Sequence, residues 1–240
     1  MSRRIQQGGP HERGGPDERA GFIEPTGPDE RAGLIERARL IERARLLNVS
    51  LDDGAAGRLL SLLNELERWN AAYSLTSIRE REQMITHHLL DSLSIHEHLS
   101  GTRIADVGTG AGFPGLPLAV ANPERQFTLI DSAGKKIRFV AHAARALGLG
   151  NVEAVHSRAE ALHPDPPFET VTARAFAALP DLLAGVLTLC RPGTRVLAMK
   201  GRRPDEEIAA VRPPWRITDV RPLEVPGLGE ERHLVVAAMS

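Results

Sequence analysis

Short β-rich runs and helical stretches alternate through the second half of this chain of 240 residues, and few folds accommodate such a pattern. Five runs are expected to be strands: residues 103–107, 126–130, 152–156, 170–173 and 194–199. The clearest helices between them cover residues 135–147 and 180–190. Strands that alternate with helices form a parallel sheet with helices packed on its faces. The sequence therefore predicts an α/β fold.

The two ends of this region depart from the alternation. Residues 215–225 and 233–239 are expected to be two strands without an intervening helix, which predicts an antiparallel hairpin at the end of the sheet. Upstream, Ser50 can cap a helix whose apolar positions continue to Trp69 with a helical period, and a second helical stretch covers residues 82–99. We therefore expect a helical lead-in over residues 49–100 and the sheet over residues 101–240.

Residues 1–48 are repetitive and rich in Gly, Pro and charged side chains. Residues 15–24 recur with few changes as residues 27–36, and the unit at residues 35–40 repeats at 41–46. Such a composition buries too little apolar surface to offset its chain entropy, so we expect a low-complexity, disordered extension. Residues 36–47 can form one or two amphipathic turns or a helix. A tail that binds RNA or a partner, and a mis-assigned start upstream of Val49, are alternatives.

Composition excludes several classes of protein. The 30 Lys and Arg against 31 Asp and Glu give a net charge of −1, which argues against binding a polyanion over the whole surface. No apolar run approaches the roughly 18 residues of a membrane span. The single Cys190 lies in an apolar run and is interpreted as a buried hydrophobe, and the nine His lack partners at metal-binding spacing. We expect a cytoplasmic, monomeric protein without metal.

A glycine cluster follows the first predicted strand. Asp106-Val107-Gly108-Thr109-Gly110-Ala111-Gly112 leads into Phe113-Pro114-Gly115, where a proline suits the first turn of a helix. Glycines let a backbone approach a ligand closely, and a helix N-terminus offers free N–H groups. The segment therefore favours a ligand site over a simple turn.

Two nucleoside cofactors are compatible with this loop. The spacing Gly110-x-Gly112-x-x-Gly115 satisfies the dinucleotide pattern for NAD, but Pro114 lies inside it. An acid at position 106 instead suits a ligand with a cationic amino acid group, and Asp131 can accept hydrogen bonds from a ribose in either class. Asp106, Gly108, Gly110 and Asp131 together favour S-adenosylmethionine.

Several further blocks appear in order along the chain. They are Trp69-Asn70 through Leu75-Thr76, His88 to Leu93, Asp106 to Gly115, Leu129 to Ser132, Gly134 to Phe139, Arg158 to Glu160, Arg174 to Phe176 and Met199 to Gly201. On these blocks the chain resembles the bacterial 16S ribosomal RNA guanine-N7 methyltransferases, the glucose-inhibited division protein B family. The resemblance runs from about Leu62 to Gly201 and is expected to continue to the end of the chain. Residues 1–48 lie outside the resemblance.

The resemblance implies a class I S-adenosylmethionine-dependent methyltransferase: a Rossmann-like, seven-stranded sheet whose last strand is antiparallel. It places the methyl donor against Gly108, Phe113, Ala159, Glu160 and Arg174, with the Ala159-Glu160 pair near the adenine. Asp91, in the helical lead-in, is interpreted as a solvated acid on a helix face.

The resemblance also implies a substrate, the 16S ribosomal RNA or the small ribosomal subunit. Guanine N7 carries a lone pair and no proton, so no catalytic base is expected, and rate comes from alignment of the reactants. Residues 132–152 contain no acid and residues 170–204 contain only Asp181. Charge alone fits a solvated surface equally well, but the resemblance favours RNA contacts by Lys135, Arg138, Lys200 and Arg202, with Arg174 or Lys200 reaching phosphate or guanine O6.

Few aromatic residues are available to stack on bases. Trp69, Tyr73 and Phe176 are the candidates, and each is expected in the core. Two alternatives to the methyltransferase stay open: an NAD-dependent oxidoreductase, and a non-catalytic RNA-binding module that retains a vestigial cofactor loop.

Overall fold

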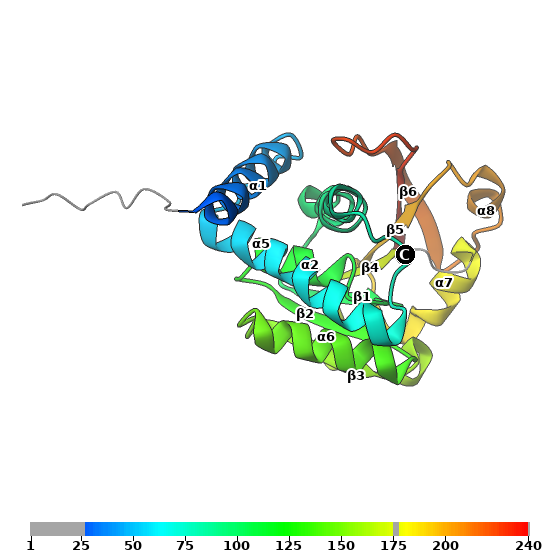
Figure 1. Cartoon of the computed structure of the whole chain (residues 1–240). Coiled ribbons are helices and arrows are strands. Elements are labelled where there is room, and N and C mark those ends of the chain that lie inside the picture. Colours follow the sequence, from blue (N-terminus) through cyan, green and yellow to red (C-terminus); the bar gives the residue numbers. More distant parts are fainter. Residues whose placement is uncertain (1–26, 175–177, 240) are drawn as a thin grey trace, which may run out of the picture.

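A seven-stranded sheet with helices on both faces organises the chain (Figure 1). The computed structural model describes residues 27–174 and 178–239. The strands are β1 (Arg103–Val107), β2 (Gln126–Asp131), β3 (Val152–His156), β4 (Thr170–Arg174), β5 (Arg195–Lys200), β6 (Trp215–Pro222) and β7 (His233–Met239), in the spatial order β3-β2-β1-β4-β5-β7-β6. Strands β1 to β5 are parallel, and β7 is antiparallel to β5 and β6. The predicted fold and terminal hairpin are confirmed, although β6 ends at Pro222.

The strands bury both of their faces, which explains their nearly continuous apolar sequences. Successive side chains point to opposite sides of a sheet. Ile104 therefore belongs to one hydrophobic core and its neighbour Ala105 to the other, and Leu197 and Ala198 divide in the same way. Each face is then available for a layer of helices.

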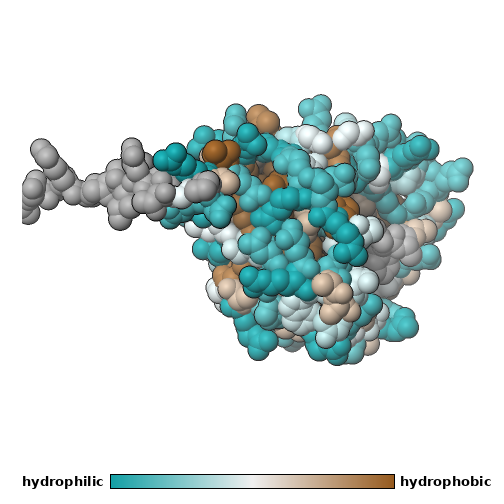
Figure 2. All heavy atoms as spheres, viewed as in Figure 1, coloured by the Kyte–Doolittle hydropathy of each residue, from teal (hydrophilic) through white to brown (hydrophobic). Residues whose placement is uncertain are grey.

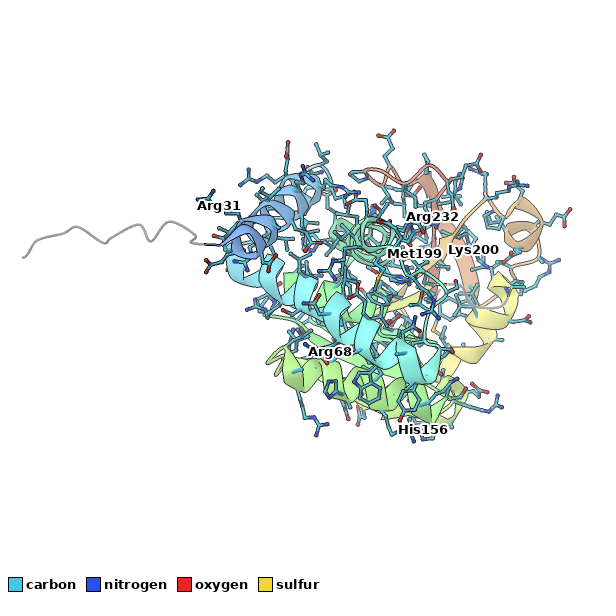
Figure 3. All side chains as sticks on the ribbon, in the orientation of Figure 1. Arg31, Arg68, His156, Met199, Lys200 and Arg232 are labelled. Atoms are coloured by element: carbon cyan, nitrogen blue, oxygen red, sulfur yellow. The ribbon has the colours of Figure 1, made fainter. Side chains whose placement is uncertain are left out.

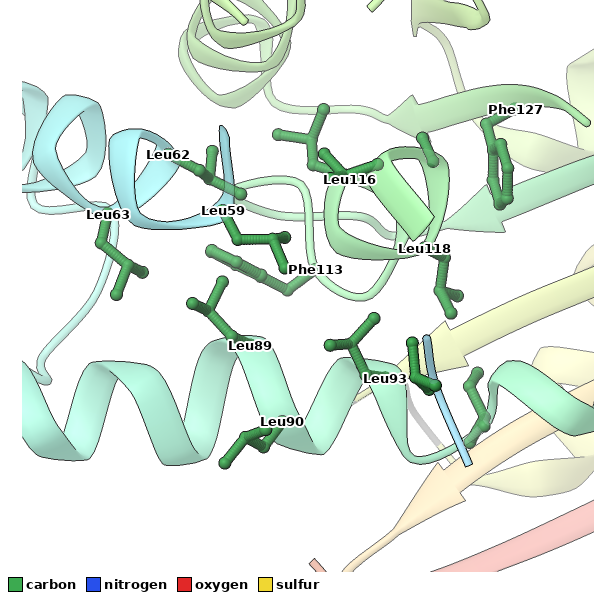
Figure 4. Close-up of a cluster of buried hydrophobic side chains, with 14 of the residues drawn as sticks. Leu59, Leu62, Leu63, Leu89, Leu90, Leu93, Phe113, Leu116, Leu118 and Phe127 are labelled. Carbon is green, nitrogen blue, oxygen red and sulfur yellow. The ribbon is translucent and has the colours of Figure 1, made fainter. Parts of the chain in front are cut away.

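The two layers of helices are unequal. The larger layer contains α2 (Asp53–Tyr73), α5 (Gly115–Ala121) and α6 (Gly134–Ala146), and its core closes around Phe113, with Leu59 and Leu89 nearby (Figure 4). The other face carries α7 (Leu179–Gly185), the short 3₁₀ helices η3 (Ala159–Ala161) and η4 (Leu187–Leu189), and next to α7 the short α8 (Asp205–Ala209). The helix predicted over residues 180–190 is thus two shorter ones.

The first helix corrects the expectation of an extended disordered leader. Residues 28–45 form α1 (Pro28–Arg45), which packs on α2, and Leu40 and Ala44 are buried. These two side chains lie four positions apart and therefore share one helix face. Arg81 donates to Glu36 at 2.8 Å, which fixes the helix further. The prediction of disorder is therefore wrong for residues 28–45, whereas the helix considered for residues 36–47 is present as far as Arg45. Residues 1–26 lie outside the described part.

The lead-in helices also differ from the prediction in detail. Helix α2 begins at Asp53 and is capped by Asp52, whose carboxylate accepts from the backbone N–H of Ala55, so Ser50 is not the cap. The second helical stretch is divided into α3 (Arg81–Met84), the π-helical η1 (Ile85–Leu90), α4 (Asp91–Leu93) and the 3₁₀ helix η2 (His96–His98). π-helical turns are rare and often occur at functional sites.

The viewed surface is mostly hydrophilic, with apolar residues in small separate patches (Figure 2). Within the described residues no helix is long and apolar enough to cross a membrane.

Candidate active site

The glycine loop connects the carboxyl end of β1 to α5. Gly108, Gly110 and Gly112 have φ angles of +67°, +61° and +86°, in the left-handed region that disfavours other residues. The backbone N–H groups of Gly108 and Thr109 both donate to the carbonyl of Ile130, at 2.9 and 3.1 Å. The loop is therefore held against the end of β2.

Asp106 supports this loop from below. Its side chain is fully buried and accepts hydrogen bonds from Thr109 Oγ1 at 2.5 Å, Gly115 N at 2.9 Å and Thr172 Oγ1 at 3.1 Å. Burial raises the pKa of Asp106 to about 6, against the opposing effect of these hydrogen bonds. The expectation that Asp106 faces a cationic ligand group is corrected: without exposed surface, it positions the loop and acts on a ligand only through it.

Asp131 stands at the carboxyl end of β2, beside the same loop. One of its carboxylate oxygens accepts from the Gly110 backbone N–H at 2.9 Å, and the other accepts from the Ala133 N–H at 2.8 Å. Lys136 Nζ lies 3.7 Å from the first of these oxygens. Each carboxylate oxygen retains a further lone pair, so Asp131 can still accept from a ligand hydroxyl.

A cavity of about 370 Å³ opens over the ends of β1, β2 and β3, and we call it the β1–β3 cavity. Its lining includes four residues predicted from the sequence: Gly108, Asp131, Ala159 and Glu160. Ala159 is buried, whereas the Glu160 side chain is exposed and lies 3.8 Å from Arg158. The predicted residues from three separate segments therefore meet in one cavity of the size that small-molecule sites have.

Phe113 and Arg174 lie outside the β1–β3 cavity. The Phe113 ring stacks on the His88 ring with centroids 4.7 Å apart, and the Arg174 guanidinium lies 5.5 Å from the same ring. Arg174 donates to the His87 carbonyl at 2.7 Å and to Asp91 at 3.0 Å. Arg174 therefore faces the helical lead-in.

A second cavity, of about 380 Å³, opens over the ends of β4 and β5, and we call it the β4–β5 cavity. Arg174, Met199 and Lys200 line it from the strands, and His88 and Asp91 line it from the lead-in. Arg232, just before β7, completes the lining, and Figure 3 shows it close to Met199 and Lys200. Its neighbour His233 pairs with Lys200 in the sheet, so Arg232 also lies at the carboxyl edge.

The environment of Asp91 differs from the sequence-based prediction. Its side chain is 2% exposed and binds two arginines, Arg174 and Arg232, so it is not a solvated acid. His88 and Arg232 were not predicted as site residues. The local sequence signal for a site at Asp91 is an acid within the mostly apolar run of residues 89–93. Arg232 lies 141 positions after Asp91, and no local pattern connects the two residues.

The predicted RNA contacts fall into two groups. Lys135 and Arg138 are exposed on α6, where Lys135 Nζ donates to the Tyr73 carbonyl at 3.3 Å. Lys200 lines the β4–β5 cavity and is paired with Glu207 at 2.8 Å, and Arg202 is exposed just after β5.

The aromatic candidates are only partly in the core. Trp69 packs on Phe139 and stacks with Tyr73 at 5.3 Å, but Tyr73 itself is exposed. Phe176 lies outside the described residues. The Tyr73 ring is therefore accessible for stacking on a base, contrary to the expectation of a core position.

Metal ligation and thiol reactivity can be assessed for the described residues. They contain no group of three or more His, Cys, Asp or Glu arranged to hold a metal ion. Burial raises the pKa of Cys190 to about 12, so its thiol is a poor nucleophile at neutral pH.

The chain is similar to known proteins in sequence. The family described as rRNA small subunit methyltransferase G matches residues 56–235. A ribosomal RNA small subunit methyltransferase G from Xanthomonas campestris pv. campestris (strain B100) is 49% identical over 191 residues, which cover 78% of this chain and 88% of the relative. Its namesake from Yersinia pestis (strain Pestoides F) is 44% identical over 189 residues, covering 78% and 92%.

Solved structures share the fold at lower identity. A SAM-dependent methyltransferase from Aquifex aeolicus superposes with a TM-score of 0.51 at 18% identity, covering 70% of this chain and 97% of that one. TrmN from Thermus thermophilus gives a TM-score of 0.52 at 22% identity, covering 72% and 53%.

Proposed function

Because the chain belongs to the rRNA small subunit methyltransferase G family, we propose that it is an S-adenosylmethionine-dependent enzyme that methylates N7 of a guanine in 16S ribosomal RNA. The family removes the NAD-dependent oxidoreductase that the Gly110–Gly115 spacing left open. We further propose that the protein acts as a monomer in the cytoplasm, on the small subunit or its RNA.

The β1–β3 cavity is the observation that carries this proposal. Gly108, at a positive φ, brings no side chain into it, and Asp131 retains lone pairs for the hydroxyls of a ribose. The adenine would lie near Ala159 and Glu160, at the end of β3. The residues present therefore fit S-adenosylmethionine, which supplies a methyl group already activated on a sulfonium.

The protein's own contribution is placement. Guanine N7 needs no deprotonation, so the reaction requires no side chain to act as a base. The buried Asp106 holds the loop that shapes the cavity, and Phe113 connects that loop to the lead-in helices. Such a rigid site can contribute several kcal/mol through alignment alone.

The RNA must approach the carboxyl edge of the sheet. Lys135 and Arg138 on α6, and Arg202 after β5, are exposed cations that we propose contact phosphates beside the two cavities. They carry no sequence information themselves, and their role is to hold the RNA in register.

The direct experiment incubates the purified full chain with labelled S-adenosylmethionine and 16S RNA, either free or in the small subunit. We expect label to appear in N7-methylguanosine, identified by mass spectrometry after nuclease digestion. Gly108→Val is the matched inactive variant, since a branched side chain at a φ of +67° distorts the loop. Absence of labelled N7-methylguanosine from every RNA substrate would contradict the proposal.

A further inference from the structure

The two cavities stand side by side in the sheet order, because the β1–β3 cavity ends at β1 and the β4–β5 cavity begins at its neighbour β4. Phe113, on the glycine loop, contacts both His88 and Arg174 of the β4–β5 cavity. Building on the proposed function, we propose that the β4–β5 cavity binds the target guanine, and that Arg174 and Asp91 together recognise its O6 and N1–H groups.

The pairing around Asp91 supports this assignment. One oxygen of the buried carboxylate accepts from Arg174 Nη1 at 3.0 Å and the other accepts from Arg232 Nε at 3.1 Å. A buried charge requires such partners, and two arginines on one carboxylate exceed what neutralisation requires. Each carboxylate oxygen still has a lone pair, and each guanidinium has five N–H donors, so the cluster can also bind a ligand.

The orientation of Arg174 is fixed before any ligand arrives. The same Nη1 donates to the His87 carbonyl at 2.7 Å, and Asp91 lies only 2% exposed in the wall of the cavity. Preorganised groups of this kind lose little conformational freedom on binding.

The donor and acceptor pattern matches guanine. Arginine offers a donor, and the neighbouring carboxylate offers an acceptor. The O6 of guanine is an acceptor beside the N1–H donor, whereas adenine has a donor at N6 and an acceptor at N1. The Arg174–Asp91 pair therefore complements guanine, and it opposes adenine with like groups.

His88 keeps the cavity suitable for an N7 nucleophile. A protonated imidazole beside N7 would donate a hydrogen bond to the lone pair that attacks the methyl group. Burial, and secondarily the charge of Arg174, lower the pKa of His88 to about 3, so its ring is neutral at physiological pH. Thr76 Oγ1 lies 3.1 Å from Nε2, while the buried Nδ1 has no partner among the described residues.

Base analogues test the assignment. Once wild-type protein has identified the methylated position, RNA is prepared with inosine or 2-aminopurine there. Inosine retains O6, N1–H and N7, whereas 2-aminopurine retains N7 and lacks O6 and N1–H. We expect wild-type kcat/KM on inosine within about tenfold of guanine, and a loss of at least about 100-fold on 2-aminopurine, as sites built for hydrogen bonding reject analogues that lack the group.

Variants connect that preference to the two residues. Asp91→Asn and Arg174→Lys are expected to lower kcat/KM on guanine at least about 100-fold, yet leave kcat/KM on 2-aminopurine within about threefold. For Asp91→Asn, at a residue that the resemblance does not place against the donor, the Kd for S-adenosylmethionine should also stay within about threefold. Arg216→Lys, on the exposed edge strand β6, is the matched control. Where Asp91→Asn does not fold, judged by thermal melting, Arg174→Lys decides, because it keeps the charge and removes the planar guanidinium.

The outcomes separate the two proposals. An unchanged ratio of guanine to 2-aminopurine activity in a folded variant, or an equal loss of S-adenosylmethionine affinity in Asp91→Asn, would overturn the guanine site while the methyltransferase function stands. A wild-type protein that produces no N7-methylguanosine on any RNA defeats the proposed function itself.

Discussion

Asp106 shows at the scale of one residue how burial connects stability to pH. It lies under the glycine loop with no exposed surface, and burial raises its pKa from 3.8 to about 6. Between these two values the native state holds a proton that the unfolded state has released. The stability that this proton contributes is complete below a pH of about 3.8 and is lost as the pH rises through about 6.

Asp106→Asn removes this dependence, because an amide does not titrate in that range. We expect the free energy of unfolding of the wild type, relative to the variant, to fall by about 3 kcal/mol between about pH 4 and about pH 7. Urea unfolding of both proteins across this range measures the difference. A difference that stays constant with pH would show that the carboxyl is not titrating in a buried state.

At the scale of elements, α1 is part of the folded domain although it precedes the region that the family matches. Leu40 is 1% exposed against α2, whereas Leu46, just past the end of the helix, is 71% exposed. Leu40→Ala should therefore cost about 2–5 kcal/mol of stability, the range for buried leucines, and Leu46→Ala close to nothing. Denaturant midpoints of the two variants give the comparison, and equal midpoints would mean that α1 is not docked in solution.

The same helix restrains the connection between β6 and β7. Arg43 donates to Thr86 at 2.7 Å and to the Pro226 carbonyl at 2.9 Å, and it pairs with Glu82. Arg43→Met removes charge-assisted bonds of about 1.5–3 kcal/mol each. We expect faster amide hydrogen exchange in residues 223–232 while the strands keep their protection. Exchange that accelerates uniformly over the chain would instead indicate global destabilisation.

Local patterns predicted most strands and the cofactor loop because each lies within one continuous segment. The strand at residues 103–107 was found in this way, and so were Gly108 and Asp131 of the β1–β3 cavity, whereas Ala159 and Glu160 came from the family resemblance. Two helical elements were not predicted from local patterns. The π-helical turn η1 has no sequence period over six residues, and the buried residues of α1, Leu40 and Ala44, lie within a charged repeat. The β4–β5 cavity joins three distant segments, so its Asp91–Arg232 pair is a tertiary property.

At the scale of the whole molecule, the net charge of −1 is compatible with binding RNA because the charges are separated. The acid-free stretch at residues 132–152 places Lys135 and Arg138 on the exposed side of α6, close to the β1–β3 cavity lined by Lys136. Most acids lie elsewhere in the sequence. Attraction for RNA is therefore expected chiefly on this part of the surface.

This separation predicts how RNA affinity responds to salt. Each phosphate contact releases a counterion, so removing one should lower the slope of log affinity against log salt by about 1. Lys135→Ala/Arg138→Ala should therefore lower the slope by about 2 and weaken RNA binding, with the Kd for S-adenosylmethionine unchanged. The control is Arg216→Ala, since Arg216 aligns through β7 with Arg195, at the opposite end of β5 from the cavities. Fluorescence anisotropy over a salt series distinguishes the variants, and equal slopes for the double variant and the control would place the RNA on another surface.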